Sequence, residues 1–426
     1  MKILTIISRI LVGSLFIVSG LIKANDSLGF SYKLVEYFEP GVLDLEFLIP
    51  LALPLAIFIS VFEIVLGFMV LFGAKMKLGS WLLLLMILFF TWLTFYSAYF
   101  DKVTECGCFG DAIKLTPWQS FTKDIVLLVF IVFIFFRRKS IEINTIRQSQ
   151  VILPLSALLI SLFSILMLEW AWIIFFFIFV SLNALLAQNF LKGNMKEIGI
   201  IGASKVFSFA LVVYTLMYLP IRDFRPYAVG KSITEGMKSA EEMGLKAPTF
   251  ATDFKLKNKV TGEEKIFSSV EYSAQKLYTD WDFIESLNNS YKVEDGYEPP
   301  IHDFILQNVE GEDLTTQILS ESKVLALVCY DLEKANLDAI KKFETQKQAL
   351  EAKGVKCYIF TASVEDEMEK VKAETGTSIP FISADGITLK TIVRSNPGFV
   401  SIKQGVVADK WSHRTARNSE EILSVF

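Results

Sequence analysis

The sequence predicts a mixed fold, in which an α-helical transmembrane bundle of about seven spans precedes a soluble α/β domain. The first observation is composition: 52% of the 426 residues are hydrophobic, 37 are phenylalanine, and the mean hydropathy is +0.45, outside the range usual for soluble proteins. The second is charge, because residues 1–220 carry a net charge of +3, which leaves −7 for the rest of a chain whose total is −4. The third is the pattern after residue 323, where short β-branched runs alternate with charged segments of helical spacing.

Charge and the scarcity of cysteine and histidine argue against several classes of function. An acidic second half is a poor partner for nucleic acid or an anionic membrane surface, because phosphate binding needs clustered Lys and Arg. Four cysteines are too few for a disulfide scaffold in a chain of this length. With only His302 and His413 present, we expect neither a histidine-rich metal centre nor haem held by paired histidines. The lipid bilayer is the first predicted partner, and no metal site is predicted.

Seven apolar segments are predicted to cross the bilayer, which takes roughly 20 residues at 1.5 Å per residue. The first segment keeps Arg9 inside it and lacks a small-residue cleavage site, so it is interpreted as a retained helix and not as a removed signal peptide. The fifth and sixth segments are separated only by Glu169 and form either a tight helical hairpin or one long broken segment. The predicted spans are 3–22, 48–72, 78–100, 121–136, 151–168, 170–190 and 198–219.

Basic residues in the short loops between the spans predict the orientation. Lys75 and Lys77 precede the third span, the run 137–139 follows the fourth, and Lys192 and Lys196 lie between the sixth and seventh. Seven spans place all three clusters on one side, which the positive-inside rule makes cytoplasmic. The loop before the fourth span and the whole chain after the seventh then face outward together. We predict a multi-pass inner-membrane protein with its C-terminal domain in the periplasm.

Residues 104–111 have the sequence TECGCFGD and carry two of the four cysteines of the chain. We call this segment the cysteine loop. Cys106 and Cys108 are separated by one glycine. A disulfide between them would be strained and more oxidising than a structural one, and Gly107 lets the backbone bend tightly enough to form it. In a redox role, either thiol would be the nucleophile and the other would resolve the mixed disulfide.

Three interpretations of this cysteine pair are open. In the first, the thiols cycle between dithiol and disulfide and pass electrons toward the bilayer, which resembles the use of quinones by vitamin K epoxide reductase-like proteins. In the second, they form a structural or intermolecular disulfide. In the third, they bind a metal, which is disfavoured because a closed site needs about four ligands and no histidine is near. We favour redox use; the cofactor is unknown, with a membrane quinone as the candidate.

Residues 1–140 contain separated elements that agree in order and spacing with a known family. They are Arg9-x3-Gly13-x2-Phe16-x2-Ser19-Gly20-x2-Lys23-x2-Asp26 with Phe30 and Tyr37, then Glu63 in the second span, and then the cysteine loop. This set resembles the four-helix unit of DoxX/MauE-type membrane proteins, and residues 219–230 resemble the juncture of Bacteroidetes DoxX-type proteins that carry a soluble C-terminal extension. The resemblance implies a membrane component associated with thiol or sulfur redox and with maturation of exported proteins.

Ionisable residues inside the first two spans are candidates for the interior of the bundle. Arg9 and Glu63 would be costly in lipid unless they pair or face a polar cavity, so we predict that they pair with each other. Such a pair would be either a structural ion pair or a group that polarises a cofactor such as a quinone, and both alternatives stay open. Lys23 lies at the outer end of the first span and is interpreted as a snorkelling anchor.

The first part of the outward-facing half combines a collar with short β-structure. Residues 219–227 contain prolines, paired charges and aromatic residues, which predicts a rigid collar just outside the membrane. Residues 248–263 and 300–312 both alternate apolar and polar side chains before a glycine-containing turn, a pattern that predicts hairpins. Between them, residues 272–298 are predicted to form a helix and a loop.

From residue 323 the pattern is strand, helix, strand, helix, followed by two strands and a last helix capped by Asn418 or Ser419. This βαβ unit with a following hairpin and helix resembles a thioredoxin fold. In that resemblance, residues 300–314 correspond to the hairpin of exported TlpA-like members, and Pro397 matches the position of the family's cis-proline. The predicted elements are 324–330, 337–353, 355–361, 364–374, 399–402, 406–411 and 419–425.

This domain lacks the pair of redox cysteines that follows the first central strand in the thioredoxin pattern. Cys329 lies within the first strand, no second cysteine follows at the helix start, and Cys357 lies within the other strand. Both are predicted to be buried core thiols, so the domain is degenerate and cannot exchange dithiols by itself. It could still bind an extended peptide beside Pro397 by pairing with a strand edge. His413 is interpreted as a surface residue and not as a base.

The predicted organisation supports two main hypotheses of function. In the first, Cys106 and Cys108 carry out thiol–disulfide chemistry on an exported client or a periplasmic thiol protein, so whether the protein is an enzyme depends on these two residues. In the second, the protein is a non-catalytic scaffold whose thioredoxin-like domain binds envelope proteins. A small-molecule transporter, suggested only by Arg9 and Glu63, ranks third. The predicted parts are a DoxX/MauE-like domain (1–140), three further spans (141–220), a periplasmic collar with a β-containing insertion (221–299) and a thioredoxin-like domain without a CxxC motif (300–426).

Overall fold

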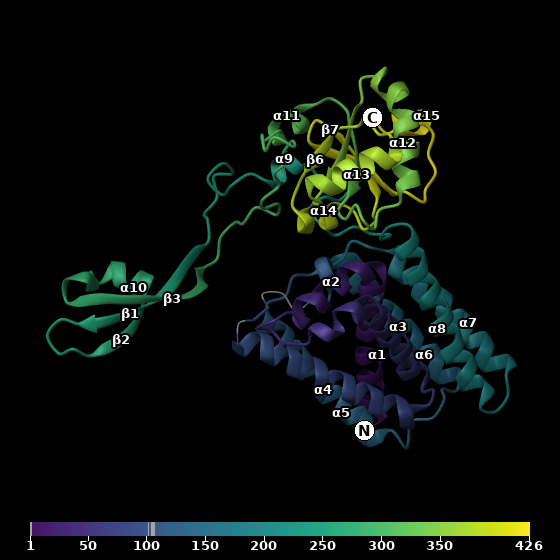
Figure 1. Ribbon diagram of the computed structural model, residues 1–426. Coiled ribbons are helices and arrows are strands. Elements are labelled where there is room, and N and C mark those ends of the chain that lie inside the picture. The colour runs from purple at the N-terminus through teal and green to yellow at the C-terminus, as the bar shows by residue number, and fades with distance from the viewer. Residues whose placement is uncertain (1, 101, 104–106) are drawn as a thin grey trace.

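Long apolar helices form a bundle, and a sheet-rich domain sits over one end of it (Figure 1). The computed structural model describes residues 2–100, 102–103 and 107–426. Within these ranges, seven helices are long and apolar enough to cross a membrane, so the chain is a multi-pass membrane protein. These helices are α1 (Lys2–Asn25), α3 (Ala52–Phe72), α4 (Met76–Phe100), α5 (Pro117–Arg137), α6 (Ile146–Leu166), α7 (Trp172–Phe190) and α8 (Met195–Met217).

The seven predicted spans are confirmed, and the structure decides between the two forms proposed for the fifth and sixth. They are separate helices, because α6 ends at Leu166 and α7 begins at Trp172. Glu169 between them has a φ of 49°, in the left-handed region that a continuous helix excludes. The Ser164 hydroxyl donates to the Trp170 carbonyl at 2.5 Å and braces the turn. The tight hairpin is therefore the correct alternative.

Helix α2 (Ser27–Phe38) lies between the first two spans and was not predicted. Asp26 caps its N-terminus by accepting a hydrogen bond from the Gly29 backbone N–H at 2.9 Å. Its buried residues include Phe30, Tyr37 and Phe38, so it packs on the bundle. The helix is too short to be recognised as a span, and it lies on the side of the bundle that faces the sheet-rich domain (Figure 1). A short 3-10 helix, η1 (Glu46–Leu51), then leads into α3.

Helices α1 and α3 come into close contact through glycines. A Cβ added to Gly67 would lie 2.8 Å from the Gly13 carbonyl oxygen, and one added to Gly20 would lie 2.8 Å from the Ser60 carbonyl oxygen. Small residues at such positions let two backbones approach, which is how helices gain contact in lipid. The spacing of glycines along the first span therefore serves helix packing.

The three basic loops lie together at one end of the bundle, as predicted. The Lys75 ammonium pairs with Glu197 at 2.9 Å, which joins the α3–α4 and α7–α8 connections. The Asn144 backbone N–H donates to the Phe72 carbonyl at 3.0 Å, which brings the α5–α6 connection to the same place. The described part of the cysteine loop and the collar contact the other end of α1. The cysteine loop and the soluble domain therefore share one side of the bundle.

The soluble domain contains a five-stranded sheet in the order β6-β5-β4-β7-β8. Strands β4, β5 and β6 are parallel, while β7 pairs antiparallel with both β4 and β8. The predicted βαβ unit, hairpin and final helix are confirmed to within two residues, and Asn418 is the cap of the final helix. Strand β6 and helix α14 were not predicted, since one is three and the other seven residues long. The elements are β4 (Val324–Cys329), α12 (Leu337–Glu351), β5 (Lys356–Thr361), α13 (Glu365–Thr375), β6 (Phe381–Ser383), α14 (Gly386–Ile392), β7 (Gly398–Lys403), β8 (Val406–Ser412) and α15 (Ser419–Leu423).

Hydrophobic layers cover both faces of this sheet. On one face α12, α13 and α15 bury residues such as Phe343, Met368 and Ile422. On the other face α14 and the short helices α9 (Ile233–Gly236) and α11 (Thr315–Ser320) pack with residues of the collar. Of these helices, α14 lies at the edge of the soluble domain next to the bundle (Figure 1).

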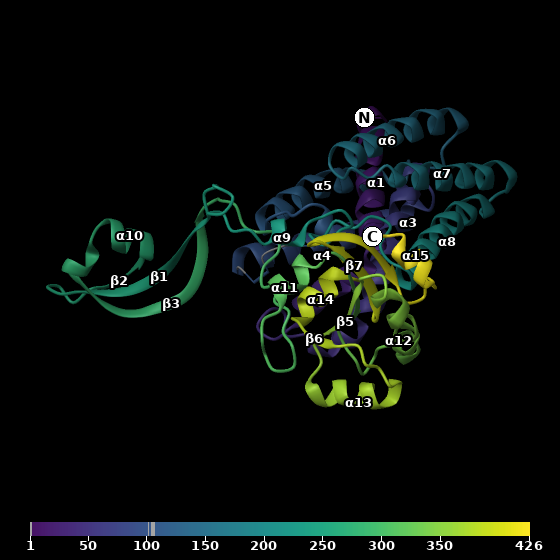
Figure 2. The ribbon, with the colours of Figure 1, turned by 90° about the horizontal axis from the view of Figure 1, so that it is seen from above.

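A three-stranded sheet, β2-β1-β3, forms an arm that projects away from both the bundle and the soluble domain (Figures 1 and 2). The predicted hairpin over residues 248–263 is confirmed by β1 (Thr249–Asn258) and β2 (Glu264–Ser268). The helix and loop predicted after it are wrong in part, because a short helix, α10 (Ser269–Ala274), is followed by β3 (Trp281–Glu294). The second predicted hairpin is reduced to an isolated bridge from Gln307 to Asp313, because Gln307 also bridges to β6.

Candidate functional site

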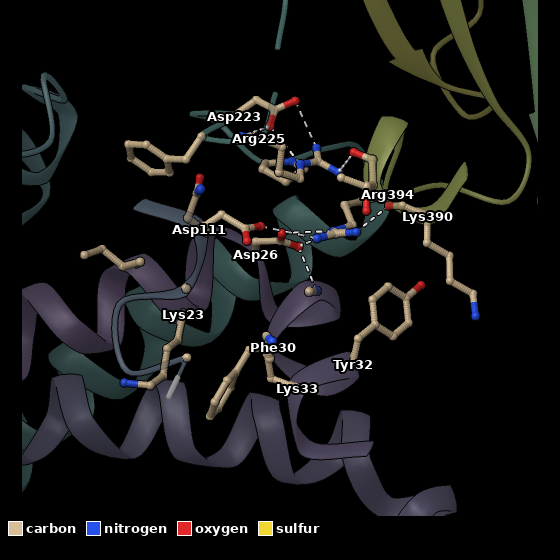
Figure 3. Close-up of a pocket in the computed structure, with 18 of the residues that line it drawn as sticks. Lys23, Asp26, Phe30, Tyr32, Lys33, Asp111, Asp223, Arg225, Lys390 and Arg394 are labelled. Atoms are coloured by element: carbon tan, nitrogen blue, oxygen red, sulfur yellow. Dashed lines mark hydrogen bonds and ion pairs between the residues drawn. The ribbon is translucent and has the colours of Figure 1, made fainter. Parts of the chain in front are cut away.

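A cavity of about 420 Å³ lies where the bundle, the cysteine loop, the collar and the soluble domain meet (Figure 3). Its walls come from α2, from Gly107, Gly110 and Asp111 of the cysteine loop, from the collar, and from α14. Its volume is in the range of sites that hold small molecules or a few residues of a peptide. We call it the interface cavity. The predicted redox loop therefore contributes to a cavity whose opposite wall belongs to the thioredoxin-like domain.

The described part of the cysteine loop is held tightly against the bundle. Cys106 lies outside the described residues. Cys108 is buried, and its carbonyl oxygen accepts hydrogen bonds from Lys23 Nζ at 2.9 Å and Ser19 Oγ at 3.3 Å. Gly107 has a φ of 70°, in agreement with the predicted bend at this position. Phe109 packs into the bundle core beside Phe163, with ring centroids 5.8 Å apart.

Lys23 and Glu63 form a buried ion pair beneath the loop. The Lys23 ammonium lies 3.0 and 2.9 Å from the two Glu63 carboxylate oxygens and donates to Ser19 Oγ at 2.6 Å. Lys23 retains 3% of its exposure and Glu63 5%. The prediction that Lys23 is a snorkelling anchor is therefore wrong. Its side chain turns inward because a carboxylate on α3 and a loop carbonyl offer it acceptors that lipid lacks.

Arg9 does not pair with Glu63, so that prediction is also wrong. Its guanidinium donates to the Val70 and Leu71 carbonyls at 2.8 and 2.9 Å and to Asn144 Oδ1 at 2.6 Å. These carbonyls belong to the last turn of α3, where unpaired acceptors and the helix dipole favour a cation. Arg9 therefore caps α3 at the end of the bundle away from the cysteine loop. These hydrogen bonds to backbone carbonyls account for the burial of the Arg9 guanidinium.

Arg394 connects the soluble domain to the cysteine loop. It lies directly after α14 and is buried at 8% exposure. Its Nε lies 2.9 Å from Asp26 Oδ2 on the bundle, and one of its terminal nitrogens lies 3.6 Å from Asp111 of the cysteine loop (Figure 3). Burial alone would lower the pKa of Arg394, but the two carboxylates together raise it. The guanidinium is therefore charged and holds three parts of the chain together.

A second buried network fixes the collar. Asp223 pairs with Arg225 at 2.7 Å (Figure 3). It also pairs with Lys410 of β8. Burial would raise the pKa of Asp223, yet the two cations lower it to about 2, while burial lowers the pKa of Lys410 to about 8. The Asn25 side-chain amide also donates to the Arg222 carbonyl at 2.7 Å and ties the collar to α1. The rigid collar that the sequence predicts is thus held from both sides.

Pro397 follows a cis peptide bond and lies three residues beyond Arg394, near the end of the sheet that faces the bundle. The Asn396 side-chain amide donates to the Asp331 carbonyl at 2.7 Å, and the His413 Nδ1 lies 2.8 Å from the Pro397 carbonyl. His413 is half-buried, and burial lowers its pKa, so it is not the plain surface residue that we predicted. The structure therefore brings the segment around Pro397 toward the cysteine loop through Arg394.

Cys329 and Cys357 are buried within β4 and β5, as predicted. Burial raises the pKa of both thiols, that of Cys357 to about 12, so neither is a thiolate near neutral pH. The remaining cysteines of the chain are the pair in the cysteine loop. Any exchange of thiols by this protein at neutral pH therefore depends on Cys106 and Cys108.

A second and smaller cavity lies on the bilayer side of the cysteine loop. It is lined by Phe16, Phe90 and Leu127 together with Lys23, Glu63 and Cys108, and its volume is about 40 Å³. This volume holds a few water molecules and is too small for a quinone ring. The membrane quinone suggested from the sequence stays a prediction. Within the described ranges, no three His, Cys, Asp or Glu side chains gather as ligands for a metal ion.

Sequence reasoning missed the contacts that assemble this site. Asp26 was noted only as part of a spacing pattern, while Asp111 and Arg394 were not identified as partners. A weak signal exists, because an ionisable residue at the outer end of a span needs a partner, and Lys23 and Asp26 both stand there. The identity of that partner depends on which distant segments pack together, so no local pattern could reveal it.

Comparisons with known proteins support the membrane domain. Residues 1–137 match the family model described as "Methylamine utilisation protein MauE". A protein described as "Protein TlpB", from Flavobacterium psychrophilum, is 30% identical over 139 residues, which are 30% of this chain and 35% of the relative. The chain thus matches about a third of the length of that curated relative. The N-terminal part is a MauE-like membrane domain, while the DoxX part of the resemblance stays a prediction.

Proposed function

We propose that this protein supports thiol–disulfide chemistry of exported proteins, with Cys106 and Cys108 as the redox pair. The observation that carries the proposal is the set of ion pairs from Arg394 to Asp26 and Asp111, because it joins the thioredoxin-like domain to the loop whose sequence contains Cys106 and Cys108. In this proposal the protein lies in the inner membrane, and the soluble domain is periplasmic. The basic loops at the opposite end of the bundle support that orientation.

The proposed reaction is an exchange with a thiol protein of the same compartment. One cysteine of the pair, as a thiolate, attacks a disulfide of the partner, so that a mixed disulfide forms and one partner thiolate leaves. The second cysteine then attacks the mixed disulfide and releases the second partner thiol. Two electrons pass to the partner, the pair becomes a disulfide, and the reverse sequence oxidises a partner dithiol. The soluble domain, which has no dithiol of its own, would hold the partner beside Pro397.

Replacement of Cys106 or Cys108 by serine tests the proposal. We expect either variant to lose support of disulfide exchange in cells that depend on this protein, because each thiol has a separate step. We further expect the single-cysteine variants of the full chain to trap a mixed disulfide with a partner, detected by non-reducing electrophoresis and mass spectrometry. The matched control is Cys357→Ala, which removes a buried thiol in β5 and should keep the exchange. Full function of both serine variants without a trapped partner would disprove the proposal.

A second candidate function is a non-catalytic scaffold. The observation in its favour is that the thioredoxin-like domain keeps its cysteines buried within strands, so that domain can bind but not exchange. In a scaffold, both serine variants would keep function, while a variant that loosens the soluble domain, such as Arg394→Met, would lose it. The same set of variants therefore separates the two candidates.

A further inference from the structure

Lys23 links the bundle interior to the backbone of the cysteine loop. An ammonium group has three N–H donors. In Lys23 they meet the Ser19 hydroxyl, the Glu63 carboxylate and the Cys108 carbonyl, all within 3.0 Å. The aromatic rings of Phe30 and Phe90 lie 5.5 and 5.9 Å from the same nitrogen. All three N–H donors of the Lys23 ammonium therefore have acceptors. One of these acceptors is the carbonyl of Cys108, whose thiol is a candidate for the redox chemistry.

The bond to Cys108 distinguishes this arrangement from an ion pair that only joins two helices. A pair between α1 and α3 would need only Lys23 and Glu63. Here Lys23 also fixes the peptide of Cys108, which is buried and whose neighbour Phe109 is packed into the core. The loop cannot shift away from α1 without leaving the ammonium short of an acceptor, and such a loss is costly in a buried site. The position of Cys108 is therefore coupled to the state of the ion pair.

We infer that Lys23 is a positioning residue for Cys108, and that the ion pair of Lys23 with Glu63 also sets the charge near the Cys108 thiol. This inference rests on the proposed redox function of Cys106 and Cys108. Lys23 acts through the Cys108 carbonyl and through its field, and it takes no part in bond making. Glu63 balances that field from the other side of the ammonium.

The two partners have opposite effects on a nearby thiolate. Loss of the Lys23 charge removes the cation bound to the Cys108 carbonyl, and a thiolate near that carbonyl loses its stabilising charge. Loss of the Glu63 charge leaves the ammonium bound to the Cys108 carbonyl, and a positive charge favours a thiolate. A purely structural pair predicts a different result, because loosening the loop by either change would expose the thiols in the same way.

The test measures alkylation of the loop cysteines by iodoacetamide in the reduced full-length protein in lipid nanodiscs, at pH 6 to 10, with each cysteine quantified by peptide mass spectrometry. We expect Lys23→Met to slow alkylation about tenfold at neutral pH and to move the midpoint of the pH profile upward. We expect Glu63→Gln to speed alkylation and to move the midpoint downward. The double variant should return toward the wild-type profile, and Lys23→Arg should retain most of the effect of lysine.

The matched control is Arg9→Met, which removes a buried cation from the same helix at its other end. It should lower thermal stability without a shift of the alkylation profile, because Arg9 contacts the end of α3 and not the cysteine loop. Shifts of the same sign in the Lys23 and Glu63 variants, or no shift in either, would overturn the inference. The proposed function fails separately, through the serine variants, so the two outcomes can be told apart.

Discussion

Buried charges in this protein are placed by specific partners, as Asp223 illustrates. Its carboxylate is held by Arg225 and Lys410, and it joins the collar to β8. A buried ion pair adds little to stability compared with apolar packing, but removal of one partner leaves the others uncompensated. Loss of the Asp223 carboxylate should therefore lower the free energy of unfolding, because it would leave two buried cations without a counter-charge.

Replacement of Asp223 by asparagine should destabilise the soluble domain by about 3–5 kcal/mol, because Arg225 and Lys410 lose their counter-charge. The pKa of Asp223 in the folded protein is about 2, below its usual value of 3.8. Its contribution is thus complete above pH 4 and is lost as the pH falls toward 2. Thermal unfolding of the full chain in detergent should show a smaller loss of stability from pH 4 to 2.5 in the variant than in the wild type. Equal losses would contradict this assignment.

At the scale of elements, the bundle depends on the close approach of α1 and α3. Gly13, Gly20 and Gly67 have no side chain at the points where the two backbones approach, and the ion pair of Lys23 with Glu63 joins the same two helices. The cysteine loop then packs against the outer end of α1. A change in the distance between these two helices should therefore reach the loop.

Gly67→Ala should destabilise the bundle by about 1–3 kcal/mol, because its Cβ would lie 2.6 Å from Ile17 and 2.8 Å from the Gly13 carbonyl oxygen. The control is Gly202→Ala in α8, where an added Cβ meets no atom within 4 Å. That variant should be neutral or slightly more stable, since alanine favours a helix over glycine. Thermal unfolding in detergent compares the two. An equal effect of both substitutions would show that glycine content, and not the helix contact, sets stability.

At the scale of the whole molecule, the described contacts between the two domains include Arg394, the collar, the Lys390 ammonium 5.4 Å from the Tyr32 ring of α2, and the Ser412 hydroxyl that donates to the Met217 carbonyl. Arg394 carries the contact between the soluble domain and both Asp26 and Asp111. The projecting arm, β1 to β3, lies apart from this contact (Figure 2). Among the described contacts, those of Arg394 tie the thioredoxin-like domain directly to the cysteine loop.

Arg394→Met should loosen the soluble domain from the bundle, because two carboxylates lose their shared cation. We expect hydrogen exchange to increase at least several-fold at residues 107–111 and in α14 of the full chain, while β4 and β5 keep their protection. The control is Lys372→Met in α13, an exposed residue with only a surface pair, which should change nothing at the interface. Unchanged exchange at residues 107–111 in the Arg394 variant would refute the role of this contact.

The sequence by itself determined the local structure of this protein. Seven apolar runs predict seven spans, and alternating strand and helix patterns predict the βαβ unit, because both signals arise from neighbouring residues and their burial. The burial of Cys329 and Cys357 followed from the strands that contain them. The bend at Gly107 followed in the same way from the residue type.

Only the tertiary structure decided the partners of the charged residues. Lys23 and Glu63 are 40 residues apart, Arg9 and Val70 are 61 apart, and Arg394 and Asp26 are 368 apart. The pattern of charges along the spans predicts a pair of Arg9 with Glu63 and an interfacial Lys23, and neither prediction agrees with the structure. Helix packing and domain docking place each charge beside its partner, and both depend on the whole chain. Local sequence patterns therefore could not predict which charged residues meet.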